Sequence, residues 1–209
     1  MGLVEDLKKQ RIVAIVRATE YSTALKIAEA FVEGGLRLIE VAFSFHGAEK
    51  LVRELRSRDN LIVGAGTVLD IGMAETAISS GAQFIVSPHT DPQILSYAKS
   101  IGIPAIPGAL TSTEIISAWR LGGDFVKVFP VRSVGGASYI RYIKEVFPFV
   151  EIMTTGGVTV DNFLEFLSAG ASLIGLSTTL IGDLRAFDFN QVVERVNTVV
   201  ERMSSFDIK

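Results

Sequence analysis

Cysteine is absent from this 209-residue sequence, and histidine occurs only as His46 and His89. Without thiols the chain can form neither a disulfide framework nor a thiolate metal site. Two histidines also argue against a multi-histidine metal centre, although carboxylates alone remain available as ligands. We therefore expect a functional site that holds no metal.

Long apolar runs and long basic runs are also missing. No stretch approaches the roughly 20 apolar residues that span a bilayer, and the N-terminal segment shows no signal-peptide pattern. The 20 Lys and Arg residues against 23 Asp and Glu give a formal net charge of −3. We expect a cytoplasmic protein that binds neither membranes nor nucleic acid.

What the sequence does contain is a repeated unit. Hydrophobic residues make up 48% of the chain, which is enough for one sizeable core. Short β-branched runs alternate with longer segments of helical spacing. The predicted strands are Arg11–Arg17, Leu36–Phe43, Leu61–Ala65, Gln83–Ser87, Ile103–Ile106, Asp124–Phe129, Val150–Thr154 and Ser172–Leu176.

Strands that are apolar on both faces indicate a parallel sheet covered by helices, and eight such units favour closure. We predict an α/β fold, a single (β/α)8 TIM barrel over residues 1–209 with a short N-terminal helix. The alternative is an open doubly wound sheet, which usually has a glycine fingerprint after its first strand. Here that strand ends in Arg17-Ala18-Thr19, which favours the barrel.

Several helix boundaries are marked by residues with a mechanical role. Asp91-Pro92 has the pattern of an N-cap followed by proline in the first turn. Thr111 and Glu114 have the spacing of a capping box. A glycine, which adopts the left-handed conformation without strain, precedes five of the predicted strands. These glycines are Gly35, Gly81, Gly102, Gly122 and Gly170.

Two charged residues lie inside apolar strands, Lys127 in FVKVFP and Glu40 in LIEVAF. Strand alternation places each on one face, and active sites of such barrels lie at the carboxyl ends of the strands. If both point inward, they meet near Arg17. An apolar site disfavours the ammonium form of lysine, and imine formation requires the neutral amine. The alternative is a buried Lys–Glu ion pair that only fixes the packing.

Glycines and hydroxyl residues follow the last two predicted strands, where such barrels often bind phosphate. Backbone N–H groups near a helix N-terminus hold an anion well. The residues so placed are Thr155, Gly156, Gly157, Gly175 and Ser177. The pattern favours phosphate binding, and the alternative is that the glycines serve only as turn residues. His89 is more typical of a solvated loop than of a proton shuttle.

Over nearly its whole length, the sequence resembles the family of 2-keto-3-deoxy-6-phosphogluconate (KDPG) aldolase and 4-hydroxy-2-oxoglutarate (KHG) aldolase. The motifs that carry the resemblance fall at the ends of the expected strands. They are IVAIVR, GGLRLIEV, VGAGTVL, GAQFIVSP, IPGALT, FVKVFP, TTGGV and IGLS.

The resemblance implies a class I aldolase, a lyase that needs no metal or other cofactor and forms a homotrimer. It makes Lys127 the Schiff-base lysine and Glu40 the general acid/base. Gly156, Gly157, Gly175 and Ser177 would bind phosphate. The substrate, a 2-keto acid, would be bound by Arg17, Ser44, Thr67, Pro88, Phe129 and Thr155.

The chain departs from the family pattern at two positions. Ser44 stands where many members have an arginine for the substrate carboxylate, so Arg17 gains importance. Leu176 stands where a glycine is common in the phosphate loop. Two other functions stay open because fold does not fix chemistry: a phosphate-binding barrel isomerase or epimerase, and a non-catalytic barrel that binds a sugar acid.

Overall fold

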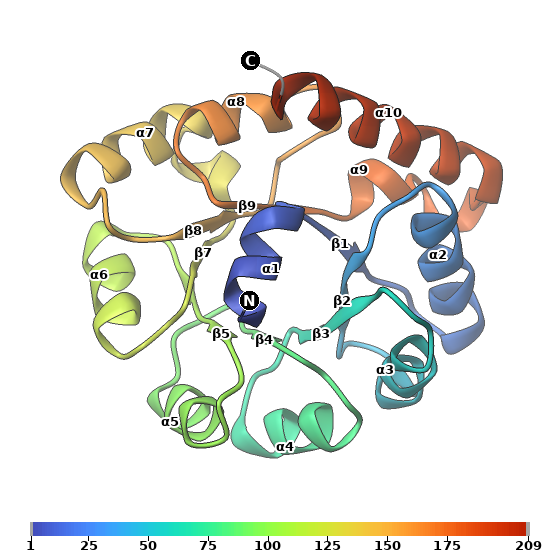
Figure 1. Cartoon of the computed structure of the whole chain (residues 1–209), viewed down its shortest axis with the longest axis horizontal. Helices are drawn as coiled ribbons and strands as arrows, with labels where there is room; N and C mark the ends of the chain where they lie inside the picture. The colour runs from blue at the N-terminus through green and yellow to red at the C-terminus, as the bar shows by residue number, and fades with distance from the viewer. Residues whose placement is uncertain (1, 208–209) are drawn as a thin grey trace.

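The computed structural model describes residues 2–207 and contains one sheet of nine parallel strands in the order β5-β4-β3-β2-β1-β9-β8-β7-β6. The strands form the inner ring of Figure 1, and helices surround them. Their bounds are β1 (Ile12–Val16), β2 (Leu38–Ala42), β3 (Ile62–Gly66), β4 (Ile85–Val86), β5 (Ala105–Ile106), β6 (Gly108–Ala109), β7 (Val126–Val128), β8 (Ile152–Thr154) and β9 (Leu173–Leu176).

The ring closes because β5 and β6 are two halves of one extended segment, interrupted at Pro107. On one side of this segment Ser87 N donates to Ile106 O (3.1 Å), and on the other Lys127 N donates to Pro107 O (2.8 Å). Nine strands thus fill eight positions, which confirms the predicted (β/α)8 barrel. The predicted strand Ile103–Ile106 was wrong in extent, because proline has no N–H with which to continue the ladder.

Helices cover the outside of the ring, as predicted (Figure 1). The two helix caps predicted from the sequence are also present. Asp91 and Thr111 accept hydrogen bonds from the first turns of their helices, and Thr111 forms the full capping box with Glu114. The bounds are α1 (Leu3–Gln10), α2 (Tyr21–Glu33), α3 (Ala48–Arg56), α4 (Ile71–Ser79), α5 (Pro92–Ser100), α6 (Ser112–Arg120), α7 (Ala137–Val146), α8 (Phe163–Ser168), α9 (Thr178–Ile181) and α10 (Phe189–Asp207), with 3₁₀ turns η1 (Val131–Val134) and η2 (Leu184–Ala186).

The core has two layers separated by the sheet. Alternate strand residues face the helices, while the others, such as Val13, Leu38 and Phe125, form a separate cluster inside the ring. Since side chains two apart share a face, Leu38 carries Glu40 inward and Phe125 carries Lys127 inward. The two charged residues therefore point into the barrel.

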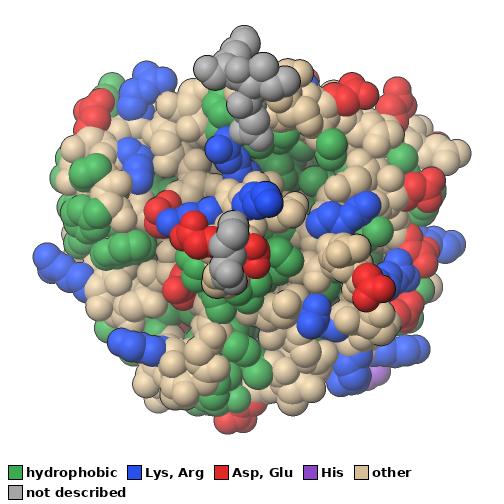
Figure 2. All heavy atoms as spheres, in the orientation of Figure 1, with side chains coloured by type: hydrophobic (Ala, Val, Ile, Leu, Met, Phe, Trp, Pro, Cys, Tyr) green, Lys and Arg blue, Asp and Glu red, His purple; other side chains and the backbone are tan. Residues whose placement is uncertain are grey.

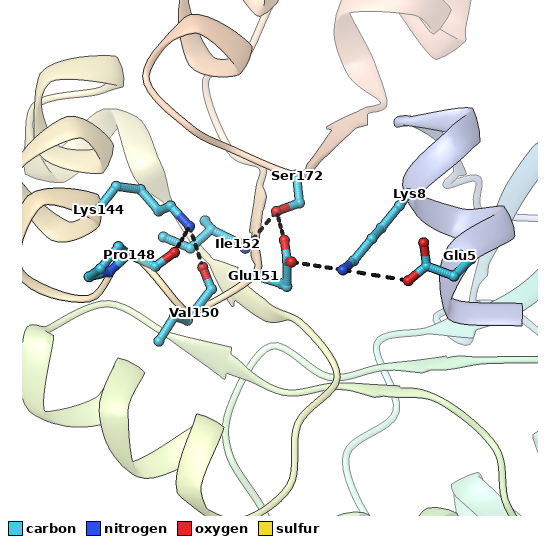
Figure 3. Close-up of polar contacts among 8 residues, drawn as sticks. All are labelled: Glu5, Lys8, Lys144, Pro148, Val150, Glu151, Ile152 and Ser172. Carbon is cyan, nitrogen blue, oxygen red and sulfur yellow. Dashed lines mark hydrogen bonds and ion pairs between the residues drawn. The ribbon is translucent and has the colours of Figure 1, made fainter. Parts of the chain in front are cut away.

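Helix α1 covers the N-terminal end of the barrel, crossing the middle of the ring in Figure 1. Its Leu7 is fully buried in the inner cluster. Lys8 Nζ lies 2.8 Å from Glu151 Oε1, and the Ser172 hydroxyl also donates to Glu151 (Figure 3). Burial would raise the pKa of Glu151, but these hydrogen bonds outweigh burial and hold it below its ordinary value.

No helix among residues 2–207 is long and apolar enough to cross a bilayer. The same residues contain no group of three His, Asp or Glu side chains arranged to hold a metal ion.

Candidate active site

A cavity of about 350 Å³ opens at the carboxyl ends of the strands, opposite α1. Residues from β1, β2, β7, β9 and the loops after β3, β4 and β8 meet there. They are Ile15, Arg17, Glu40, Thr67, Pro88, Lys127, Phe129, Thr155, Gly156, Gly157, Val158, Gly175, Ser177 and Thr178. Parallel strands bring these distant segments together because all of them end at the same rim.

Lys127 and Glu40 lie at the floor of this cavity. The Lys127 Nζ atom is 3.9 Å from Glu40 Oε1, and their side chains are only 7% and 1% exposed. The same amine lies 5.5 Å from the centroid of the Phe129 ring, which forms part of the wall. An amine so sheltered from water, beside a carboxylate that can exchange protons, suits nucleophilic attack on a carbonyl.

Glu40 is a buried carboxylate that lacks hydrogen bonds from the described part of the chain. Neither of its side-chain oxygens forms a hydrogen bond with any described residue. Burial raises its pKa, and the positive charges of Lys127 and Arg17 offset this only in part. A buried polar group without partners is expensive, and such groups mark sites where a ligand completes the set. Both oxygens of Glu40 can therefore accept hydrogen bonds from a substrate in the cavity.

Gly66, at the end of β3, makes room for the Glu40 side chain. A Cβ atom at this position would overlap Glu40 Oε1 and crowd the remainder of the carboxylate. Only glycine fits beside Glu40 without displacing it. The glycine of the VGAGTVL motif is thus explained by a close approach rather than by a turn.

Arg17 and Thr67 form one side of the rim. Arg17 Nη2 donates a hydrogen bond to Thr67 Oγ1 at 3.1 Å. Thr67 has a φ of +58°, in the left-handed region that β-branched residues rarely adopt. Strain of this kind costs about 1–3 kcal/mol and is concentrated at functional sites. The arrangement orients the arginine at the cavity mouth.

The part of the rim at the ends of β8 and β9 is lined by glycines, and β9 pairs with β1, the strand that precedes Arg17. Gly156 and Gly157 have φ values of +82° and +105°, so their backbone makes a tight turn over the cavity. At Gly175 a Cβ would lie 2.9 Å from Met153 Cε. Ser177 Oγ donates to Ile15 O at 3.0 Å, which leaves its lone pairs and backbone as the groups open to a ligand.

Leu176, the second departure from the family pattern, does not obstruct this side. Its side chain is fully buried in the outer layer of the core, and it does not line the cavity. The alternation of β9 turns Leu176 away from the site and Gly175 toward it.

Eleven of the twelve predicted site residues line the cavity, and Ser44 does not. Ser44 is exposed in the loop after β2. His89 is exposed as well and lies outside the lining. The sequence analysis missed Ile15, Val158 and Thr178, although Ile15 shares a strand face with Arg17 and was open to the same alternation argument.

Comparison with known proteins gives a consistent result. The family model for KDPG and KHG aldolase matches residues 3–196. A 2-dehydro-3-deoxy-phosphogluconate aldolase of Treponema pallidum is 31% identical over 91% of this chain and 92% of that protein. The KHG/KDPG aldolase of Escherichia coli is 31% identical over 91% of each chain.

Solved structures agree. The KDPG aldolase of Legionella pneumophila, captured with pyruvate at low pH as a covalent carbinolamine intermediate, superposes with a TM-score of 0.85. It is 25% identical, and the match covers 95% of this chain and 98% of that one. Sequence and structure together show that this protein belongs to the KDPG and KHG aldolase family.

Proposed function

We propose that the protein is a class I aldolase that holds its substrate as an imine on Lys127. The substrate is a 2-keto-3-deoxy-6-phospho sugar acid or 4-hydroxy-2-oxoglutarate, and the products are pyruvate and glyceraldehyde 3-phosphate or glyoxylate. The observation that carries the proposal is the buried amine 3.9 Å from the buried Glu40 carboxylate at the floor of an open cavity.

The reaction follows from this pair. The Lys127 amine, in its unprotonated form, attacks the C2 ketone to give a carbinolamine. Its hydroxyl takes a proton from solvent and leaves as water, which gives an iminium that serves as an electron sink. Glu40, directly or through a water molecule, takes the proton of the C4 hydroxyl as the C3–C4 bond breaks. The aldehyde leaves, and protonated Glu40 returns the proton to C3 of the enamine. Water then hydrolyses the imine and releases pyruvate.

The proton cycle suits the environment of Glu40. A carboxyl group whose pKa is raised by burial is protonated more readily than a solvated one, which suits a group that must take up a proton and return it. No partner competes for its oxygens among the described residues, so both remain free for the substrate.

The remaining residues are assigned by their place in the cavity. Arg17 and Thr67, joined at one side of the rim, bind the substrate carboxylate, and Phe129 with Pro88 forms an apolar wall. Thr155, Gly156, Gly157, Gly175 and Ser177 bind the distal phosphate through hydroxyl and backbone groups.

Borohydride reduction in the presence of pyruvate tests the proposal. We expect an irreversible mass gain that maps to Lys127, and the Lys127→Ala variant should lose both this adduct and cleavage activity. Lys8→Ala, a lysine at the other end of the barrel, is the matched control. Full activity in Lys127→Ala would refute the mechanism, and a wild type that neither cleaves the keto acids nor traps pyruvate would favour an isomerase or epimerase.

We further propose that the protein forms the homotrimer implied by its family and works in the cytoplasm. Exposed apolar side chains gather where α6 and α7 end: Leu121 (44% exposed), Tyr142 (65%), Val146 (66%) and Phe149 (56%). Figure 2 shows the corresponding hydrophobic area beside these helices. A second copy of the chain would cover it. Light scattering on wild type and Phe149→Asp tests this, and a monomeric wild type would contradict it.

A further inference from the structure

The turn after β7 lies against the glycine turn after β8. Two backbone hydrogen bonds join them: Val131 N donates to Thr155 O and Arg132 N donates to Gly156 O, each at 3.0 Å. Both acceptors belong to residues that line the cavity. The start of η1 is therefore held at a fixed distance from the side of the site that faces the distal part of the substrate.

The Arg132 side chain crosses the backbone of Gly157. A Cβ atom on Gly157 would overlap Arg132 Cβ and lie 3.1 Å from its Cγ and Cδ. The aliphatic stem of the arginine thus fills the space that a side chain at position 157 would occupy. Because Gly157 lines the cavity, the stem packs against a turn at the cavity rim. Arg132 itself does not line the cavity, so its guanidinium group would have to turn toward the mouth to meet a ligand.

The guanidinium group of Arg132 has no partner. Arg132 is exposed, and within residues 2–207 neither a salt bridge nor a side-chain hydrogen bond engages it. By contrast, several other arginines, among them Arg58, Arg185 and Arg195, are held by carboxylates or carbonyls. An unpaired guanidinium presents a planar fork of donors that matches phosphate oxygens.

The turn after β8 contributes no Lys or Arg side chain to the lining of the cavity. The positively charged residues of the lining are Lys127, at the floor, and Arg17, which donates a hydrogen bond to Thr67. Backbone N–H groups and hydroxyls alone would face a group that carries about two negative charges at neutral pH. A nearby arginine supplies the missing charge.

We propose that Arg132 is a specificity-determining residue that binds the terminal phosphate of the substrate. This inference rests on the aldolase function proposed above and deepens it. Arg132 makes the enzyme favour a six-carbon keto acid that ends in phosphate over one that ends in a hydroxyl, or over the shorter 4-hydroxy-2-oxoglutarate, whose second carboxylate lies next to the bond that breaks.

The test compares Arg132→Ala with wild type on three substrates: 2-keto-3-deoxy-6-phosphogluconate, its unphosphorylated form, and 4-hydroxy-2-oxoglutarate. Loss of one charged hydrogen-bonding partner should lower kcat/KM for the phosphorylated substrate by about 10- to 100-fold, mainly through KM. The other two substrates should change by less than about twofold. Arg132→Lys should fall between, because lysine keeps the charge without the fork.

Two controls separate this inference from the proposed function. Arg141→Ala removes the same charge from an exposed position on α7 and should leave all three substrates unaffected. Pyruvate trapping by borohydride should be equal in wild type and Arg132→Ala. Equal trapping with unchanged phosphate preference would overturn the role of Arg132 alone. If wild type traps no pyruvate, the proposed function fails and this inference fails with it.

Discussion

Glu151 at the N-terminal end of the barrel is partly exposed and Glu40 at the carboxyl end is buried, and the two carboxylates have opposite hydrogen-bonding surroundings. Glu151 accepts hydrogen bonds from Lys8 and Ser172, and its pKa is lowered. Glu40 accepts none from the described residues, and its pKa is raised. Satisfied carboxylates stabilise a fold, whereas an unsatisfied one is tolerated where chemistry needs it.

The hollows at the two ends differ in the same way. The one beside α1 has about 410 Å³ and is slightly larger than the cavity at the opposite end. It is lined by two acidic residues, of which Asp124 accepts a hydrogen bond from Ala105 N and Glu5 lies 3.7 Å from Lys8 Nζ. Size alone therefore does not identify the site, and the unsatisfied acid beside a sheltered amine does.

Removing the acid at the carboxyl end should have the largest effect. Glu40→Gln keeps the shape of the side chain but cannot carry the proton, so kcat should fall by about 10²- to 10⁴-fold. Pyruvate-dependent trapping of Lys127 should persist, because imine formation does not depend on the C4 proton. Steady-state cleavage assays and mass spectrometry measure the two quantities. A kcat within tenfold of wild type would contradict the assigned role.

Displacing the acid should have the next largest effect. Gly66→Ala places a methyl group where Glu40 Oε1 lies, and a shift of about 1 Å can lower a rate about 10²-fold. Since both changes act on one group, Gly66→Ala in the Glu40→Gln background should cost much less.

Gly72→Ala is the control for this substitution. Gly72 is exposed in α4, and the nearest atom to its added Cβ is Asp70 Oδ1 at 3.4 Å. Its kcat should match wild type. Additive losses in the Gly66→Ala and Glu40→Gln double variant would show that Gly66 acts on something other than Glu40.

Removing the acid at the N-terminal end should affect stability and leave the chemistry unchanged. Glu151→Gln weakens the contact with Lys8, and because both side chains are about one-third exposed, the loss should be about 1 kcal/mol in the free energy of unfolding. Urea denaturation measures it, with the exposed Glu145→Gln as control. A fall in kcat/KM at unchanged fold would contradict the separation between the two ends.

The smallest effect concerns pH. The pKa of Glu151 is below its ordinary 4.5 in the folded protein, so its stabilisation is present above that pH and is lost on acidification. The pKa of Glu40 is raised, so its contribution is largest below pH 4.5 and is lost as pH rises. The difference in free energy of unfolding between wild type and Glu151→Gln should increase as pH rises, whereas the difference between wild type and Glu40→Gln should decrease. Parallel curves would contradict the two environments.

Much of this arrangement could be predicted from the sequence because parallel strands obey simple rules. Alternation placed Lys127 and Glu40 each on one face of its strand, and the active-site position common to such barrels favoured the inward face that the structure shows. Loop geometry has no such periodicity, so nothing in the sequence indicated that Ser44 would be exposed beside the cavity. Thr67 adopts the left-handed region because tertiary contacts override the backbone preference of a β-branched residue. The sequence alone indicates only that preference, so it could not predict this conformation.

The contacts of Arg132 were out of reach for the same reason. Its role depends on the meeting of two turns that are 25 residues apart in the chain, and an exposed arginine in a loop has no distinguishing pattern of its own. The break at Pro107 is an intermediate case: proline predicts an interrupted ladder, but not that the strand resumes beyond it.

The interruption at Pro107 weakens the strand pairing at β4, β5 and β6, so the hydrogen bonds along this seam of the ring should open more easily than those between the other strands. Strands β4, β5 and β6 have only two residues each, whereas β1, β2 and β3 have five. Amide hydrogens along this seam, such as that of Ser87, should therefore exchange with deuterium sooner than those between β2 and β3. The Lys127 amide donates to the same segment. Local opening around Lys127 should therefore begin beside Pro107 and require less free energy than global unfolding of the barrel.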